Sequence, residues 1–451
     1  MTRSDLRIRR LLPIWAPLGL TFLLLSGGTP VINAAINRLP GVAQEEELAA
    51  FALLLGMAVL LQSPLFVCRE IAIRLSVDRA GSRQALRVCL AASVVVSGLE
   101  LLLGLTPLGS MVLSLFTENT AIVDRAHGAV AYLSPMPLFV AVRGVYQAHQ
   151  IRVDDTLFVG AGTLLRLAAT AVIGFVFGPT LGMSGAELGT LCMVSGAGIE
   201  MLFAVGRARI SARPPEHAPA GTVRIDPWRF AIPLMIANSL GVASSVFYLK
   251  LTGAVPADQQ ANSFAAFQEV RSLQWLLVSG AVALQSLTTA KVQTRADAIA
   301  MLRFGVAVSG VLTVGFAVCA TVPSFRHAIL VDMLGEVSGG DAFLMASSAI
   351  VVAAAMPLFQ GVRFVLRGVL ISRGQTGVIT VGTVTTLLML STALSFGFVF
   401  FDLNGALNAY IWWAITLNVE IAILARAVFG APSRPSGIPI PIRTPRETSA
   451  G

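Results

Sequence analysis

Proline and arginine recur at matched positions in two apolar stretches of this sequence. "MPLFVAVRGVYQAHQ" begins at position 136 and "MPLFQGVRFVLRGVL" begins at position 356, so Pro137 and Arg143 correspond to Pro357 and Arg363. A guanidinium group suits carboxylates and phosphates, because its donors form a planar fork. A proline inside a membrane helix bends the helix and frees a carbonyl group. The pattern predicts anion-binding arginines, with Pro137 and Pro357 as bends that are either static or moving hinges.

Two more arginines, Arg166 and Arg271, lie in apolar stretches at comparable depth. Arginine inside a membrane is costly and usually faces a bundle interior or an aqueous cavity. Arg271 stands two residues after Glu269, which puts the two side chains on different faces of a helix. The hypothesis is a positively charged central cavity lined by these guanidinium groups; the plain alternative for Arg143 and Arg363 is that they reach the membrane surface.

Polar residues in the stretches expected to line such a path complete the candidate site. The candidate substrate contacts besides the arginines are Asn33, Gln62, Asn238 and Gln268. Glu269 is the candidate for binding a coupling ion, H⁺ or Na⁺. Glu100, Glu200 and Glu420 lie in stretches expected at the periphery of the bundle, near an interface. No metal site and no cofactor are expected, because the histidines and cysteines lack metal-ligand spacing.

Composition places these residues in a membrane protein. The chain has 451 residues, of which 55% are hydrophobic and only 12% charged. A membrane-spanning helix needs roughly 20 mostly apolar residues. Twelve such spans are predicted, at about 11–36, 48–68, 85–107, 126–150, 156–178, 184–206, 228–251, 260–288, 300–323, 342–371, 376–400 and 404–429. The net charge of +8 does not indicate nucleic-acid binding, since the basic clusters lack interleaved aromatic residues.

Basic residues alternate with acidic or neutral loops along the chain. Arginines precede the first span and follow the second, sixth and tenth spans, whereas the intervening loops hold residues such as Glu45, Glu118 and Asp402. By the positive-inside rule, this alternation predicts an even number of spans in the cell membrane, with both termini in the cytoplasm. The predicted organisation is a six-helix lobe at 1–206, a cytoplasmic linker at 207–227, a second six-helix lobe at 228–429 and a disordered basic tail at 430–451.

The two matched stretches extend into a longer internal repeat. An ungapped alignment of 136–167 on 356–387 also matches Thr156 with Thr376 and Thr163 with Thr383. Because each half has an even number of spans, the halves insert the same way up, which makes the repeat parallel. Such repeats are typical of transporters, although channels also arise by duplication. A membrane enzyme is not expected, since no nucleophile, His pair or acid cluster is in place.

The chain resembles the MOP superfamily of exporters and flippases, and most of all the progressive ankylosis protein family and its bacterial relatives. The similar segments include "PLGLT" at 17–21, "ELAAFALLLGMAVLLQSPLF" from Glu47 and "YLSPMPLFVAVRGVYQAHQIRVDDTLFVG". The resemblance implies two lobes that rock to alternate access to a cavity, and organic or phosphate-bearing anions as cargo. MATE antiporters of that superfamily use an intramembrane acid for coupling, but the first span here has no carboxylate.

Together these observations predict an all-α polytopic protein, acting as a monomer without cofactor, that exports a small organic or phosphate-bearing anion by alternating access. Two alternatives stay open. One is a flippase for a lipid-linked saccharide, and the other is a MATE-type multidrug antiporter.

Overall fold

The computed structural model describes residues 6, 8–39, 44–115, 119–211, 213–218, 225–333, 339–396 and 403–430, and these residues contain helices and no strand. The N-terminal half comprises α1 (Ile8–Ser26), α2 (Gly28–Ile36), α3 (Gln44–Gln62), η1 (Ser63–Val67), α4 (Cys68–Leu75), α5 (Arg79–Leu105), α6 (Pro107–Ser114), α7 (Thr120–Val130), η2 (Ala131–Leu133), α8 (Met136–Arg152), α9 (Thr156–Val172), η3 (Ile173–Phe177), α10 (Gly178–Leu181) and α11 (Gly185–Ser211).

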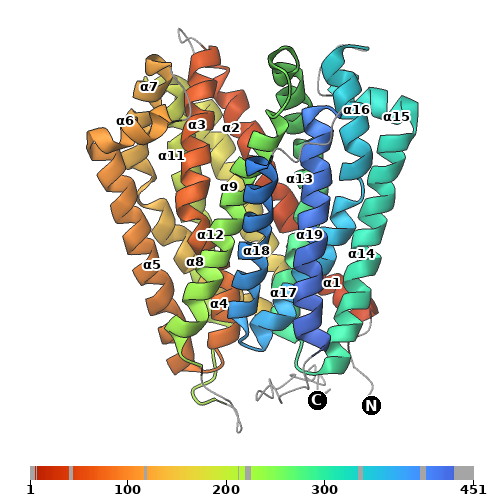
Figure 1. The fold of residues 1–451 in the computed structure, drawn as a ribbon. Helices are drawn as coiled ribbons and strands as arrows, with labels where there is room; N and C mark the ends of the chain where they lie inside the picture. Colours follow the sequence, from red (N-terminus) through yellow and green to blue (C-terminus); the bar gives the residue numbers. More distant parts are fainter. Residues whose placement is uncertain are drawn as a thin grey trace.

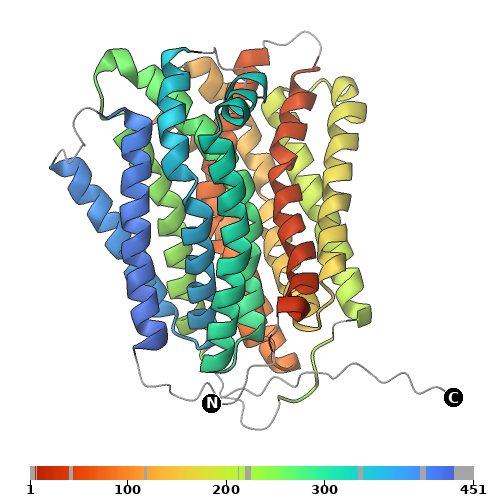
Figure 2. The same cartoon turned by 90° about the vertical axis from the view of Figure 1, so that its right-hand side faces the viewer.

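The C-terminal half comprises α12 (Pro227–Thr252), α13 (Ala257–Lys291), α14 (Arg295–Thr321), α15 (Pro323–His327), η4 (Ala328–Met333), α16 (Asp341–Ala353), α17 (Met356–Ser372), α18 (Thr376–Ser395) and α19 (Gly405–Phe429). The long helices stand side by side along one axis (Figures 1 and 2). We call the end that holds the start of α1 and the end of α19 the basal end; it is the lower end in Figure 1.

The helices have the length and composition that a bilayer requires. In the described part of the chain, nine helical segments are long and apolar enough to cross a membrane, and two bent pairs of helices raise this number to eleven. The one predicted span that is not among these eleven is the eighth, at about 260–288; it lies in α13, a helix of 35 residues whose apolar run is interrupted by polar residues. The prediction of an all-helical, multi-pass membrane protein is confirmed.

The predicted bends lie close to the two prolines, but their geometry differs from the prediction. The axes of the helices before and after the break differ by 46° at α7–η2 and α8, and by 40° at α16 and α17. Pro137 and Pro357 lie in the first turns of α8 and α17. A proline in the first turn removes no intrahelical hydrogen bond, since the first N–H groups of a helix have no partner there. The prolines therefore begin new helices after a break and do not interrupt a helix.

The internal repeat is visible in the start positions of three helix pairs. Helices α8 and α17 start at 136 and 356, α9 and α18 at 156 and 376, and α11 and α19 at 185 and 405. The turns before α9 and α18 also match, because Asp154 and Gly374 both have positive φ angles, 62° and 74°. Equivalent segments therefore adopt equivalent backbone conformations, as a parallel repeat requires.

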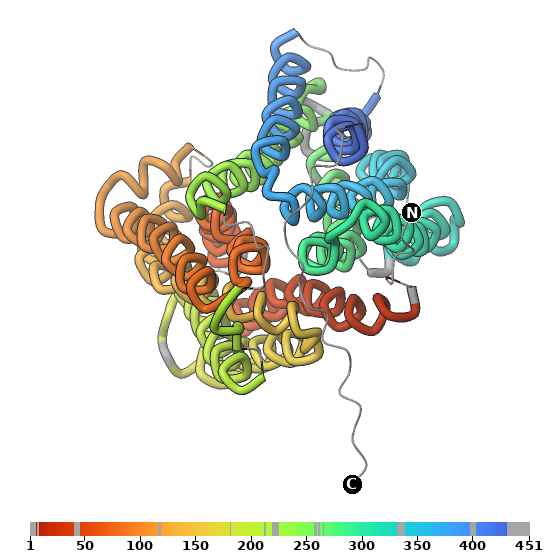
Figure 3. Tube along the Cα trace, turned by 90° about the horizontal axis from the view of Figure 1, so that it is seen from below, coloured from red at the N-terminus to blue at the C-terminus, as the bar shows by residue number. Residues whose placement is uncertain are grey.

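The first helix of each half packs against the second span of the other half. Helix α1 packs on α13, and α12 packs on η1 and α3. Seen from the basal end, the N-terminal half (red to yellow-green) and the C-terminal half (green to blue) lie on opposite sides (Figure 3). One cluster of buried apolar residues continues across both halves, from Phe51 and Leu65 to Leu284 and Phe304.

The predicted boundaries of the linker and the tail can be compared with the structure only where these segments are described. Helix α11 continues to Ser211 and so enters the expected linker, and α12 begins at Pro227. Residues 212 and 219–224 of that linker and the predicted tail from 431 onward lie outside the described residues, as do Glu118 and Asp402.

Candidate functional site

A buried carboxylate holds the predicted arginines of the N-terminal half together. Glu200 of α11 is 1% exposed and forms ion pairs with Arg143 of α8 and with Arg166 of α9, the latter at 3.4 Å. Gln147 and Thr163 donate hydrogen bonds to Glu200 Oε1 at 3.0 and 2.9 Å. We call these five residues the N cluster.

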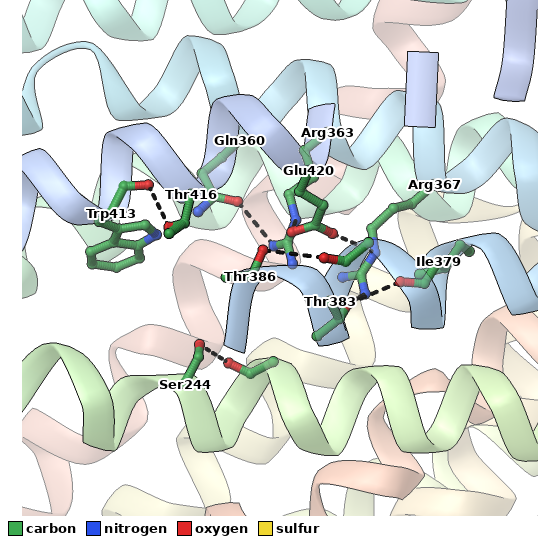
Figure 4. A network of polar contacts seen from close by, with 12 residues as sticks. Ser244, Gln360, Arg363, Arg367, Ile379, Thr383, Thr386, Trp413, Thr416 and Glu420 are labelled. Atoms are coloured by element: carbon green, nitrogen blue, oxygen red, sulfur yellow. Dashed lines mark hydrogen bonds and ion pairs between the residues drawn. The ribbon is translucent and has the colours of Figure 1, made fainter. Parts of the chain in front are cut away.

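The C-terminal half repeats this arrangement (Figure 4). Glu420 of α19 is 2% exposed, and its Oε2 lies 2.9 Å from Arg363 Nε. Arg367 Nε lies 3.7 Å from Glu420 Oε1, and Arg367 Nη2 donates to Thr383 Oγ1 at 3.4 Å. Arg363 Nη1 also donates to Gln360 Oε1 at 3.3 Å. We call these five residues the C cluster.

The two clusters correspond residue by residue in part. With the same offset as the repeat, Arg143 matches Arg363, Thr163 matches Thr383, and Glu200 matches Glu420. The second arginine of each cluster occupies a different position. Arg166 lies on α9, the helix that follows Arg143, whereas Arg367 lies on α17, one turn after Arg363. In the repeat, Arg367 is equivalent to Gln147 of the N cluster.

Three buried glutamates are the residues of this region that the sequence analysis placed wrongly. Glu100, Glu200 and Glu420 were expected at the periphery near an interface, but they are 0, 1 and 2% exposed. A longer alignment of the internal repeat would have indicated that Glu200 and Glu420 are equivalent. Continued without a gap beyond 167 and 387, it pairs Gly185 with Gly405 and Glu200 with Glu420.

Two residues of α4, also not predicted, lie between the clusters. Arg69 interacts electrostatically with Arg143 and Glu200 of the N cluster, and its guanidinium carbon lies 4.9 Å from the centre of the Phe22 ring. Glu70 interacts electrostatically with Arg367 of the C cluster. The string of charges therefore continues from one half to the other through two neighbouring residues.

Glu70 also forms a hydrogen bond across the two halves. It is 4% exposed, and its Oε1 accepts from Ser286 Oγ of α13 at 2.7 Å. Its Oε2 has no hydrogen-bond partner among the described residues. Buried polar atoms normally have hydrogen-bond partners, so a buried carboxylate oxygen without one indicates a role for Glu70 beyond packing of the two halves.

Positive charge exceeds negative charge along this string. The two clusters together with Arg69 and Glu70 hold five arginines and three glutamates. The cluster arginines also keep 8–16% of their side-chain surface accessible, whereas the cluster glutamates keep 2–3%. The accessible side of each cluster is therefore cationic, which suits an anion.

Three of the four predicted arginines belong to the clusters, and Arg271 does not. Arg271 Nη2 donates to Ser245 Oγ at 3.2 Å, and its guanidinium carbon lies 5.9 Å from the centre of the Phe267 ring. The guanidinium groups thus form one cluster in each half, with Arg271 elsewhere, and do not surround a single centre.

The other candidates have diverse surroundings. Gln62 Nε2 donates to Glu100 Oε1 at 2.8 Å, and Asn238 Nδ2 donates to the carbonyl oxygen of Ser63 at 2.6 Å. Gln268 is exposed, and Asn33 and Glu269 are partly buried. Gln62 and Asn238 thus serve contacts within the protein in this conformation.

Comparison with known proteins finds similar structures but no similar sequences. No family model and no curated protein matches the sequence. Among solved structures, the eukaryotic MATE transporter AtDTX14 has a TM-score of 0.69 at 13% identity, with 94% of this chain and 97% of that chain covered. The Vibrio cholerae MATE transporter VcmN in its bent form has a TM-score of 0.66 at 14% identity and covers 94% of this chain and 97% of its own.

A third similar structure is a MOP superfamily transporter from Pyrococcus furiosus, described with a binding pocket of reverse polarity that suggests a different function. Its TM-score is 0.67 at 12% identity, with 93% of this chain and 95% of that chain covered. The chain therefore has the fold of the MATE and MOP transporters, with two lobes of helices related by a parallel repeat. At these identities the likeness is one of fold; closeness to the progressive ankylosis family stays a prediction.

Proposed function

We propose that the protein is a secondary transporter of the MOP type that exports a small organic or phosphate-bearing anion by alternating access. In this proposal the protein is a monomer in the cell membrane, with 1–206 and 228–429 as its lobes and both termini in the cytoplasm. The two clusters bind the anion, and Asn33 and Gln268 are further candidate contacts.

The excess of arginine over glutamate in the string of charges carries this proposal. An arginine fork binds carboxylate and phosphate with two parallel hydrogen bonds. The fold supports the transport class, because the similar solved structures are MATE and MOP transporters. The description of the Pyrococcus furiosus protein supports the view that pocket polarity varies within this fold.

The absence of an acid from the first span argues against the multidrug antiporter. Helices α1 and α2 contain no aspartate or glutamate. A cationic drug also gains nothing from a site in which guanidinium groups are the accessible part. Glu269 of α13 stays a candidate for the coupling ion.

Export of anions by cells tests the proposal. Cells that express the wild-type protein, the Arg143→Gln/Arg363→Gln double variant or an empty vector are compared by untargeted mass spectrometry of the medium. We expect one or more carboxylate or phosphate compounds to accumulate with the wild type and to fall at least about tenfold with the double variant, since each lost bidentate contact weakens anion binding.

Arg125→Gln is the matched control, because Arg125 also pairs with carboxylates, Glu46 and Glu47, but lies outside the clusters. Its export should equal that of the wild type at equal protein abundance in the membrane. Export of cations alone, or accumulation of a lipid-linked saccharide in the outer leaflet, would contradict the proposal and favour the antiporter or the flippase.

A further inference from the structure

A second buried carboxyl group of the N-terminal half lies outside the string of charges and lacks an arginine. Glu100 of α5 is 0% exposed. Its Oε1 accepts one hydrogen bond, from Gln62 at 2.8 Å, and its Oε2 has no hydrogen-bond partner among the described residues. No ion pair of the described part of the chain includes Glu100, whereas Glu200 and Glu420 each pair with two arginines.

This environment favours a neutral acid over a carboxylate. An ionised carboxylate without a cation is expensive to bury in a membrane protein, and one neutral amide offsets only part of that cost. A carboxylic acid, in contrast, needs only a hydrogen-bond partner for its C=O group and one for its O–H group. Gln62 supplies the first.

A nearby hydroxyl group on the same helix also lacks a partner. Ser97 precedes Glu100 by three residues, which places both side chains on one face of α5. Ser97 Oγ is buried without a hydrogen-bond partner among the described residues. The face of α5 that carries Glu100 therefore holds two polar groups with unused hydrogen-bonding capacity.

Glu100 is connected to the interface of the two lobes through a broken helix. Gln62 is the last residue of α3, and the span continues as the 3₁₀ turn η1 with Pro64 in its first turn. The next carbonyl group, that of Ser63, accepts the hydrogen bond from Asn238 of the other lobe at 2.6 Å. Gln62, which bonds to Glu100, therefore adjoins the residue that bonds to the other lobe. A change in the Gln62–Glu100 hydrogen bond acts directly on the Ser63–Asn238 contact between the lobes.

None of the charged groups on the helices packed against α5 forms a described ion pair or hydrogen bond with Glu100. Helix α5 packs against α3, α4, α6, α7, α8, α12, η1 and η2. Of these, α6 and η1 carry no ionisable side chain, and the only such group of η2, Tyr132, is exposed.

On α3 and α7, Glu46 and Glu47 pair with Arg125, and His127 Nε2 lies 3.0 Å from the carbonyl oxygen atoms of Leu103 and Thr106. Asp124 is the remaining ionisable side chain of α7.

On α8, Arg143 pairs with Glu200, Arg152 donates to the carbonyl oxygen of Ile73, and His149 contacts Ser82 near the basal end. Helix α4 carries Cys68, Arg69, Glu70 and Arg74, of which Arg69 and Glu70 belong to the string of charges, and α12 carries Arg229, Tyr248 and Lys250. None of these groups forms a described ion pair or hydrogen bond with Glu100.

We propose that Glu100 is a proton-binding site of the N-terminal lobe: its carboxyl group holds a proton in the conformation seen here and releases it when the lobes move to the other conformation. This inference rests on the proposed transport cycle and names its coupling ion. Release of the proton leaves a carboxylate that attracts further donors or water, which disturbs Gln62, the break after α3 and the Ser63–Asn238 contact.

Spin labels that report the separation of the lobes test the inference without any substrate. Cysteines replace Leu115 and Leu344, which are 80 and 58% exposed, in a chain with Cys319→Ala, since the other three cysteines are buried. The distance between the labels is measured in nanodiscs by double electron–electron resonance from low to high pH.

We expect the distance distribution of the wild type to shift as pH rises. Glu100→Gln, which mimics the protonated acid, should keep the low-pH distribution throughout, with at least a tenfold smaller population of the second conformation at high pH. Glu100→Asp should retain a pH response. Glu187→Gln is the matched control and should respond as the wild type does, because the Glu187 carboxylate accepts hydrogen bonds from Ser184 at the start of α11 and lies outside the string of charges.

Several results would overturn the inference: a wild type whose distance distribution does not change with pH, a Glu100→Gln variant that responds as the wild type does, or loss of the response in Glu187→Gln. A response to Na⁺ at constant pH without a response to pH would assign the site to sodium. If Glu100→Gln does not fold, infrared difference spectroscopy of the wild type and of Glu100→Asp tests the inference. The C=O band of the protonated acid must vanish at high pH, and its frequency must differ between the wild type and Glu100→Asp. Failure of anion export leaves all these readouts intact, so the two proposals fail separately.

Discussion

At the scale of single residues, each lobe contains one glutamate that neutralises part of the charge of two arginines. Burial of a charge costs several kcal/mol unless a partner and further hydrogen bonds compensate for it. Glu200 meets this requirement with two arginines, Gln147 and Thr163, and Glu420 does so with Arg363 and Arg367. The glutamates therefore stabilise the arginines in the membrane and leave each cluster with net positive charge.

Replacement of Glu420 by Gln should destabilise the protein more than most single substitutions. The change leaves Arg363 and Arg367 buried without a counter-charge, which costs on the order of 3–5 kcal/mol. We expect a clear fall in the apparent unfolding temperature, measured by intrinsic fluorescence in detergent.

Glu187→Gln is the comparison for this variant. Among the described residues, the Glu187 carboxylate bonds only to the backbone N–H and hydroxyl groups of Ser184 next to the start of α11, so its loss should change stability by about 1 kcal/mol or less. Equal unfolding temperatures for the two variants would contradict the assigned role of Glu420.

At the scale of helices, close approach between neighbours fixes where the cluster residues lie. Helix α17, which carries Arg363 and Arg367, packs along α13. Gly368 permits this approach, because a Cβ atom there would lie 2.6 Å from Thr288 Cβ and 2.8 Å from the carbonyl oxygen of Gln285. Small residues at membrane helix interfaces commonly allow such contact.

Gly368→Ala should therefore separate α17 from α13. We expect destabilisation of about 1–3 kcal/mol from overpacking and a loss of anion export. The control is Gly377→Ala in the first turn of α18, where an added Cβ atom would meet no atom within 4 Å. Fluorescence-monitored unfolding compares the two, and a Gly368→Ala protein as stable as the Gly377→Ala protein would contradict the packing argument.

At the scale of the whole molecule, polar contacts join the lobes from the middle of the bundle to the basal end. Trp15 Nε1 donates to the carbonyl oxygen of Gly280 at 3.2 Å, and Lys291 Nζ lies 2.6 Å from Asp154 Oδ1. The Ser63–Asn238 and Glu70–Ser286 hydrogen bonds also join the two halves. If the protein works by alternating access, this conformation is closed at the basal end. These contacts must then break before the lobes can adopt the conformation that is open at that end.

Ser286→Ala should shift the balance of conformations toward opening at the basal end. The loss of one hydrogen bond of about 1 kcal/mol changes the population ratio roughly fivefold. The distance between spin labels on the two lobes measures this ratio.

Ser239→Ala is the control for this shift, because Ser239 Oγ bonds, in the described part of the chain, only to the carbonyl oxygen of Met235 in its own helix. Its distance distribution should match that of the wild type. An unchanged distribution in Ser286→Ala would show that the Glu70–Ser286 contact does not hold the lobes together.

The sequence by itself determined the helical membrane fold, its parallel repeat and three of the four cluster arginines, Arg143, Arg166 and Arg363, but not Arg367. These features are local, because a bilayer demands long apolar helices and makes each buried charge conspicuous. The tertiary structure decided the partners. Glu200 lies 57 positions from Arg143, and whether its side chain faces that arginine depends on how α8, α9 and α11 pack. Composition and periodicity do not encode the rotation of one helix against another. The positions of Glu100 and Glu70 inside the bundle therefore emerged only when the helices were assembled.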